Sequence, residues 1–132
     1  VDPTDAGNRA ILVASEFGHA DIVKILLNWR GRNNIAVDPR EHFRYMNPII
    51  LAMKKNHVEV VKALLAWKGD NGERVDPLSD AGEAFHNAVD KGYVDIVRQL
   101  LRWGRETGVD VDPTGYSKGY TKKKRDEYED ED

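Results

Sequence analysis

Apolar side chains recur at helical spacing in the segment 47–67. They fall on both sides of Asn56-His57, and this pattern predicts two short helices joined by a tight turn. Helices this short are unstable alone, because nucleation costs more than so few backbone bonds return. Each helix therefore needs a neighbour to pack against. The apolar positions are Ile49, Ile50, Ala52 and Met53 in the first helix and Val60, Val61, Leu64 and Leu65 in the second.

The same pattern occurs upstream in 9–29 and downstream in 83–103. Two markers accompany it: Val-Asp-Pro begins at residues 1, 37, 75 and 111, and Trp stands at 29, 67 and 103, so that neighbouring Trp residues are 38 and 36 positions apart. Such a period is typical of a solenoid, which needs about three repeats for stability. We therefore expect a repeat domain at 1–113, with repeats at 1–36, 37–74 and 75–110 and the start of a fourth loop at 111–113, followed by a charged tail at 114–132.

The order of elements is expected to be the same in each repeat. Val-Asp-Pro opens a turn-rich loop, here called the finger, because Pro presets a turning backbone. The first helix begins at a small residue or Pro and ends at Gly or Asn, which tolerate a left-handed backbone. An acidic residue then opens the second helix and complements its dipole. The expected starts are Ala10, Pro48 and Ala84, the ends Gly18, Asn56 and Gly92, and the acids Asp21, Glu59 and Asp95.

Composition and charge narrow the classes of function. The chain has 132 residues, a formal net charge of -3 and no cysteine. The negative charge argues against a nucleic-acid binder, and the lack of cysteine excludes a disulfide framework or a thiolate metal site. No apolar run is long enough to span a membrane, and no secretory signal pattern is present. We expect an intracellular, cytoplasmic protein, with the nucleus as the alternative. Because the chain starts at Val1 within a repeat, we interpret it as a fragment that lacks an upstream segment.

The chemistry-bearing residues do not form a catalytic set. His19 and His57 stand at equivalent turns, and His42 alone cannot make a metal site or a nucleophile–base pair. The glycines are scattered rather than gathered into a phosphate-binding loop. We therefore expect no enzyme activity, no cofactor, no metal and no small-molecule substrate. The three Trp residues are expected to follow each second helix and to pack beneath the next loop, because they carry so much apolar area.

The residues around the turns resemble the ankyrin repeat. Segments 18–27 (GHADIVKILL) and 56–65 (NHVEVVKALL) resemble its second half, and 47–52 (NPIILA) and 84–88 (AFHNA) its first half. The resemblance covers residues 1 to about 113. It implies an all-α ankyrin-repeat solenoid of three helix-turn-helix repeats with extended finger loops, in which His86 bonds within the scaffold. Arg9-Ala10 and Glu83-Ala84 depart from the family's Thr-Pro. The period also exceeds the usual length of about 33 residues, which we attribute to a longer loop between each Trp and the next Val-Asp-Pro.

The long repeat with its Trp, Gly and Val-Asp-Pro markers is similar to ankyrin arrays of large DNA viruses, fish iridoviruses in particular. Viral ankyrin proteins commonly divert innate immune signalling, such as the NF-κB pathway, or recruit ubiquitin ligases. The sequence has no F-box-like segment. The resemblance therefore implies a signalling decoy that binds a host protein.

The family resemblance implies a binding surface along the fingers and the exposed sides of the first helices, as solenoids generally use such faces. The middle finger is the longest, with eleven positions from Val37 to Pro48 against nine in the others, and it holds residue types enriched at interfaces. Either Phe43 or Tyr45 packs between fingers instead. The candidate binding residues are His42, Phe43, Arg44, Tyr45, Met46, Lys54, Lys55, Phe17, Asp80 and Lys91. Further positions expected on this face are Asp5, Asn8, Glu16, Ser79, Glu83 and Asp90.

Both ends of the chain offer alternative contacts. Lys122, Lys123, Lys124 and Arg125 fit a short nuclear-import patch and would suit a nuclear or nucleic-acid-associated adaptor, although the acidic run 129–132 beside them is more typical of a solvated tail. At the other end, Ile11, Val13 and Ile25 are expected to be exposed. Terminal repeats need a polar outer face, so these side chains provide a route to self-association through the first repeat.

Overall fold

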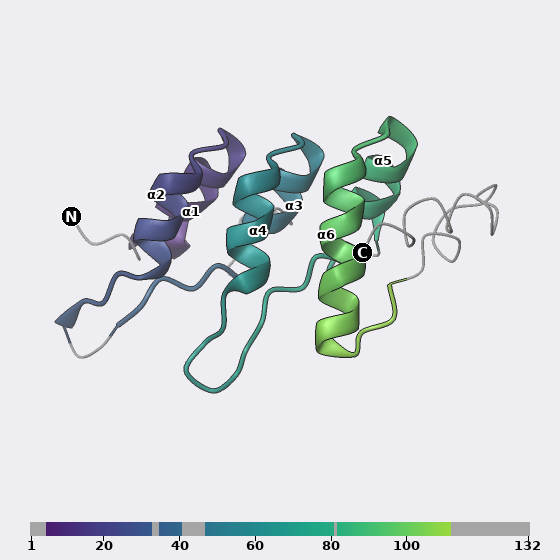
Figure 1. Ribbon diagram of the computed structural model, residues 1–132. Coiled ribbons are helices and arrows are strands. Elements are labelled where there is room, and N and C mark those ends of the chain that lie inside the picture. The colour runs from purple at the N-terminus through teal and green to yellow at the C-terminus, as the bar shows by residue number, and fades with distance from the viewer. Residues whose placement is uncertain (1–4, 33–34, 41–46, 81, 112–132) are drawn as a thin grey trace. The chain divides into compact units, whose positions relative to one another are not determined.

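The computed structural model describes residues 5–32, 35–40, 47–80 and 82–111, with the side chains of 5–8 excepted. This part of the chain forms three helix-turn-helix pairs (Figure 1). It contains no β-strand beyond an isolated antiparallel bridge between Arg30 and Ala36. The predicted all-α repeat architecture is therefore confirmed. The helices are α1 (Asp5–Glu16), α2 (Ala20–Leu27), α3 (Pro48–Lys54), α4 (Val58–Ala66), α5 (Glu83–Lys91) and α6 (Val94–Thr107).

The chain divides into two compact units, Val1–Asp76 and Pro77–Asp132. The first unit holds repeats 1 and 2, in which α3 packs on α1 and α4 packs on α2 (Figure 1). The second unit holds repeat 3, in which α5 packs on α6. The apolar positions predicted for the two helices of 47–67 are all buried. The largest fully buried side chains include Ile11, Ile49, Ile50, Met53, Val60, Val61 and Leu64 in the first unit and Phe85, Ile96 and Leu100 in the second.

The turn between the two helices is the same in all three repeats. As predicted, the backbone is left-handed at the expected Gly or Asn, with φ angles of 75°, 59° and 74° at Gly18, Asn56 and Gly92. The next amide then donates a hydrogen bond to an alanine carbonyl near the end of the first helix. These bonds are His19 to Ala14 at 2.9 Å, His57 to Ala52 at 2.9 Å and Tyr93 to Ala88 at 2.8 Å.

The predicted starts of the first helices are correct in one repeat. Pro48 begins α3, where the Asn47 side chain accepts a hydrogen bond from the Ile50 amide at 3.0 Å and caps the helix. Helix α1 instead begins at Asp5 rather than Ala10, because no proline interrupts 4–10 and an acidic residue suits a first turn. Helix α5 begins at Glu83, one residue before the predicted Ala84.

The described parts of the loops after α2 and α4 share a hydrogen bond. In each, the helix ends before Trp, and a glycine amide two residues later donates to the carbonyl four residues further on: Gly31 to Ile35 at 2.7 Å and Gly69 to Glu73 at 2.8 Å. A Cβ built at Gly31 would lie 2.3 Å from the Trp29 ring. Trp29 thus packs against the loop that follows it, as predicted.

The chain after α6 differs from these two loops. Helix α6 continues past Trp103 to Thr107 and ends at Gly108, which has a φ of 78° and donates to the Gly104 carbonyl at 2.9 Å. Trp103 is therefore inside the helix and buried, so the prediction that every Trp follows its helix is wrong here. The physical reason is local, because Arg105-Glu106 are good helix formers where repeats 1 and 2 carry turn residues.

Candidate protein-binding surface

Three predicted binding residues occupy the same position at the end of each first helix. Phe17 is 62% exposed, and Lys55 and Lys91 are exposed as well. In the first unit α1 packs on α3, which places Phe17 and Lys55 on adjacent repeats. Lys54 and Glu16 precede them and are half-buried. The structure thus brings an exposed aromatic ring and a cation to the same end of two packed helices.

The rest of the predicted surface is only partly described. His42, Phe43, Arg44, Tyr45 and Met46 lie outside the described residues, as do the side chains of Asp5 and Asn8 and the basic residues 122–125. Their place in a binding surface stays a prediction. In the second unit, Ser79, Glu83 and Asp90 are exposed.

Asp80 has a role in the scaffold that the sequence analysis missed. Its Oδ2 accepts a hydrogen bond from the Ala84 amide at 2.9 Å, so it satisfies one of the free amides at the start of α5. The side chain is half-buried. The sequence could have indicated this role, because Asp is a preferred capping residue and Asp80 stands just before the start of α5.

His86 lies near this cap on α5. Burial lowers the pKa of His86, and the charges of Asp90 and Asp80 oppose this shift only in part. A half-buried histidine whose neutral form is favoured suits a scaffold position.

Arg40 joins the two sequence markers within repeat 2. Its backbone amide and Nε donate hydrogen bonds to Asp38 Oδ1 at 2.9 and 3.0 Å, and its Nη2 donates to Oδ2 at 3.0 Å. The guanidinium carbon also lies 5.8 Å from the centroid of the Trp67 ring, within cation–π range. Burial raises the pKa of Asp38, but the hydrogen bonds and charge of Arg40 outweigh it and leave that pKa below its usual value. The Asp of Val-Asp-Pro therefore anchors a link to Trp.

The loops after α2 and α4 are joined by an ion pair. Arg30 Nη2 and Nη1 donate to the two carboxylate oxygens of Asp70 at 2.8 and 3.2 Å. A cavity of about 200 Å³ lies between these loops and is lined by Trp67 and by charged side chains. The pair is exposed, at 44% and 62%, so it contributes at most about 1 kcal/mol. The pair therefore links the loops after α2 and α4 but adds little to the free energy of unfolding.

His57 forms a contact between repeats 1 and 2. Its Nε2 lies 3.0 Å from the carbonyl oxygen of Glu16, at the end of α1. Its ring rests on Gly18, where an added Cβ would lie 2.7 Å from Nδ1. The local pattern predicted only the turn position of His57, because its partner lies 41 residues away.

The exposed apolar residues of repeat 1 differ from those predicted. Val13 is 40% and Ile25 68% exposed, as predicted, and Ile22 is also exposed, at 47%. Ile11, in contrast, is fully buried, so its predicted exposure is wrong. Residues two apart on a helix point to opposite sides, and Ile11 lies on the buried side with Ala14 and Ser15.

No three His, Cys, Asp or Glu side chains in the described ranges gather closely enough to hold a metal ion. No helix among those residues has the length and apolar character needed to cross a membrane.

A family model described as ankyrin repeats (3 copies) matches residues 11–114. The match spans all three helix pairs and agrees with the resemblance carried by the turn residues. No curated protein and no solved structure matches the chain. Proteins built from such repeats are generally modules that bind other proteins and are typically not enzymes.

Proposed function

Because this chain belongs to the ankyrin-repeat family, we propose that it is a non-enzymatic module that binds another protein through its fingers and the ends of its first helices. The observation that carries the proposal is the exposure of Phe17, 62% of which faces solvent at the end of α1. Lys55 is exposed at the equivalent position of the adjacent repeat. Aromatic residues are enriched in the hot spots of interfaces, and positions on packed helices lose little freedom on binding.

The proposed partner is a host protein of an innate immune pathway such as NF-κB signalling. In this proposal the chain is a viral decoy that acts in the host cytoplasm. The support is the similarity of its repeat length and of its Trp and Val-Asp-Pro markers to ankyrin arrays of large DNA viruses.

The test is a pull-down from host-cell lysate with the full chain and with two surface variants. Phe17→Ala combined with Lys55→Glu should abolish capture of the partner, and so should Phe43→Ala combined with Arg44→Ala. Lys68→Glu is the matched control, because Lys68 is an exposed lysine on the loop after α4. The thermal midpoint should stay nearly unchanged for all three, since surface substitutions usually alter stability by about 0.5 kcal/mol or less. Undiminished capture by the first two variants would contradict the proposed surface.

A second candidate function is a nuclear or nucleic-acid-associated adaptor, favoured only by the run of four basic residues at 122–125. Its test is binding to DNA and RNA across a salt series. Affinity should fall steeply with salt and should vanish when 122–125 are deleted. No binding at low salt would exclude this function.

A further inference from the structure

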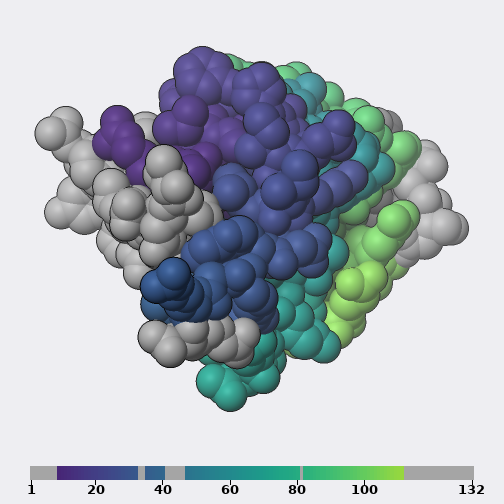
Figure 2. Space-filling view, turned by 90° about the vertical axis from the view of Figure 1, so that its left-hand side faces the viewer, coloured from purple at the N-terminus to yellow at the C-terminus, as the bar shows by residue number. Residues whose placement is uncertain are grey.

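Equivalent positions of repeats 1 and 2, 38 residues apart, differ sharply in exposure. Ile22 is 47% exposed but its counterpart Val60 only 1%, and Val13 is 40% exposed but its counterpart Leu51 only 7%. Repeat 2 differs from repeat 1 in having the neighbouring helices α1 and α2 packed against it. The corresponding side of repeat 1, here called the N-face, is formed by Val13, Ile22 and Ile25. Figure 2 looks onto the end of the first unit, where α1 and α2 form the surface.

The junction between repeats 1 and 2 shows what such a face binds. His57 sits over Gly18 and lies 3.0 Å from the Glu16 carbonyl. A side chain at Gly18 would overlap the imidazole, because a Cβ there lies 2.7 Å from Nδ1. The counterpart of His57 on the N-face is His19. It is exposed, with its ring centroid 6.4 Å from that of Phe17.

Repeat 3 carries the same seat. Gly92 and Asp90 are the counterparts of Gly18 and Glu16, and the φ angles of the two glycines are 74° and 75°. The turn hydrogen bonds match as well, at 2.8 Å from Tyr93 to Ala88 and 2.9 Å in repeat 1. Among the described residues, no atom lies within 4 Å of a Cβ built at Gly92. The backbone that holds a histidine ring in repeat 1 is thus formed in repeat 3 as well.

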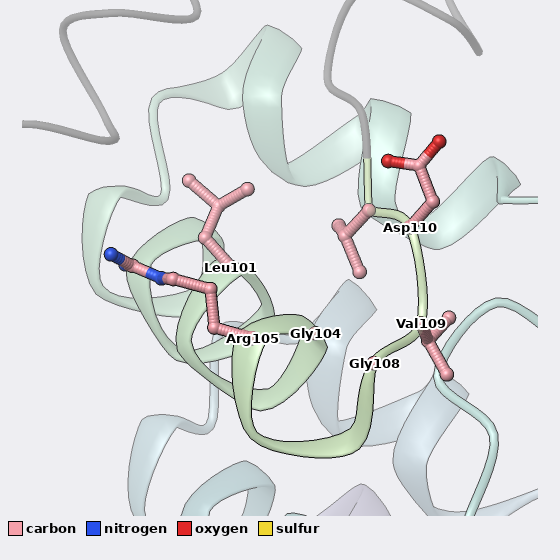
Figure 3. A pocket seen from close by; sticks show the side chains of 7 residues that line it. Leu101, Gly104, Arg105, Gly108, Val109 and Asp110 are labelled. Carbon is pink, nitrogen blue, oxygen red and sulfur yellow. The ribbon is translucent and has the colours of Figure 1, made fainter.

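A hollow beside α6 gives a second correspondence. At the junction of repeats 1 and 2, Leu27 and Trp67 line the same two cavities. The counterpart of Leu27 in repeat 3 is Leu101, which lines a cavity of about 470 Å³ together with Val109 and Asp110. Figure 3 shows Leu101 and Asp110 on opposite sides of this hollow. The counterpart of Trp67 on the incoming repeat is Trp29.

We propose that the N-face of one copy of this chain docks on repeat 3 of a second copy. His19 of the first copy occupies the seat at Gly92 and the Asp90 carbonyl of the second copy, and Trp29 lies at the Leu101 cavity. The occupant is a second copy because this chain itself carries both halves of the junction seen between repeats 1 and 2. The two surfaces differ, so the contact is heterologous and does not close on itself. It goes beyond the proposed function, since it needs no other protein.

The first experiment is sedimentation of the full chain from low to high micromolar concentration. The mass should rise with concentration beyond that of a dimer, and Ile22→Lys should abolish the rise. Ile35→Lys is the matched control, because Ile35 is also 47% exposed but stands in the loop after α2. A monomer at every concentration would overturn the proposal. So would an equal loss of association in the two variants.

The second experiment separates head-to-tail docking from a dimer of two N-faces. Gly92→Asn should fold, because Asn56 adopts the same left-handed backbone at the equivalent position, and an unchanged circular dichroism melting curve verifies this. The new side chain should block the seat and abolish association. An equal mixture of Ile22→Lys and Gly92→Asn chains should restore it as a 1:1 dimer that grows no further, since one intact face remains on each chain. Undiminished association of Gly92→Asn alone, or no dimer in the mixture, would contradict the proposal.

Discussion

The segments 67–75 and 103–111 have the same length and the same first and last residue types, but their backbones differ. In repeat 2 the chain leaves the helix before Trp67 and closes a turn from Gly69 to Glu73. In repeat 3 the helix runs through Trp103 to Thr107. The markers thus fix where a repeat begins and ends, whereas the residues between them decide the local conformation. Gly-Asp-Asn-Gly favours a turn, and Gly-Arg-Glu-Thr permits another helical turn.

The largest expected effect is a loss of stability from truncating a core leucine, and it should be equal in repeats 2 and 3. The leucine stands in the second helix of each repeat, ahead of the segment in which the two backbones differ. Leu64 in α4 and Leu100 in α6 are equivalent and both fully buried. Leu64→Ala and Leu100→Ala should each lower the free energy of unfolding by about 2–5 kcal/mol, measured by urea denaturation. A much smaller loss for one of them would mean that the repeats also differ in their cores.

A methyl group at the glycine just after each Trp, Gly69 in the loop after α4 and Gly104 inside α6, should separate the two conformations. A Cβ at Gly104 would lie 2.7 Å from Val111 Cγ2 and 2.8 Å from the Val109 carbonyl oxygen, so Gly104→Ala should cost about 1–3 kcal/mol by overpacking. At Gly69 the nearest atom is the Glu73 carboxylate end, which can move, and Gly69→Ala should cost less than about 1 kcal/mol. Thermal unfolding of the two variants measures both. The opposite order would contradict the packing described for α6.

The ends of the two second helices should respond differently to loss of a charged residue. Arg74 Nη2 donates a hydrogen bond to the Leu65 carbonyl at the end of α4, whereas its counterpart Asp110 is exposed. Arg74→Ala should cost about 1.5 kcal/mol, as for a hydrogen bond from a charged donor. Asp110→Ala should change stability by about 0.5 kcal/mol or less. Equal effects in chemical denaturation would show that Arg74 is not a cap.

The smallest effect is a difference in pH dependence. Burial lowers the pKa of His86 from 6.5, so the unfolded chain binds more protons and stability falls as the pH drops below about 6.5. The pKa of Asp38 is lowered from 3.8, because Arg40 outweighs the effect of burial. Its contribution is present above about pH 4 and lost below it. His86→Gln should flatten the stability curve between pH 7 and pH 5, and Asp38→Asn only below about pH 4. Thermal unfolding across this pH range measures both effects. If the His86→Gln variant shows the same dependence of stability on pH as the wild type, the expectation for His86 is wrong.

Sequence periodicity predicted those features that depend on residues close together in the chain. The helix pairs and the left-handed turns at Gly18, Asn56 and Gly92 follow from local patterns, whereas the exposure of Phe17 was implied by the family resemblance. Contacts between distant residues were not predicted, because no local pattern encodes them. The clearest are the His57 contact with Glu16 and the Arg40 contact with Trp67. Asp80 was predicted as a binding residue from the family resemblance, and its half-buried carboxylate also caps a helix.

The contact between His57 and Glu16 also joins two parts of the chain that are synthesised one after the other. The acceptor carbonyl and the Gly18 seat belong to the earlier repeat, and the imidazole that fills them comes 41 residues later. Chains are synthesised from the N-terminus, so the seat emerges before the ring that fills it. Because a single repeat is not stable alone, the seat and the ring order together when the second helix pair packs on the first. The contact then fixes the register of the two repeats.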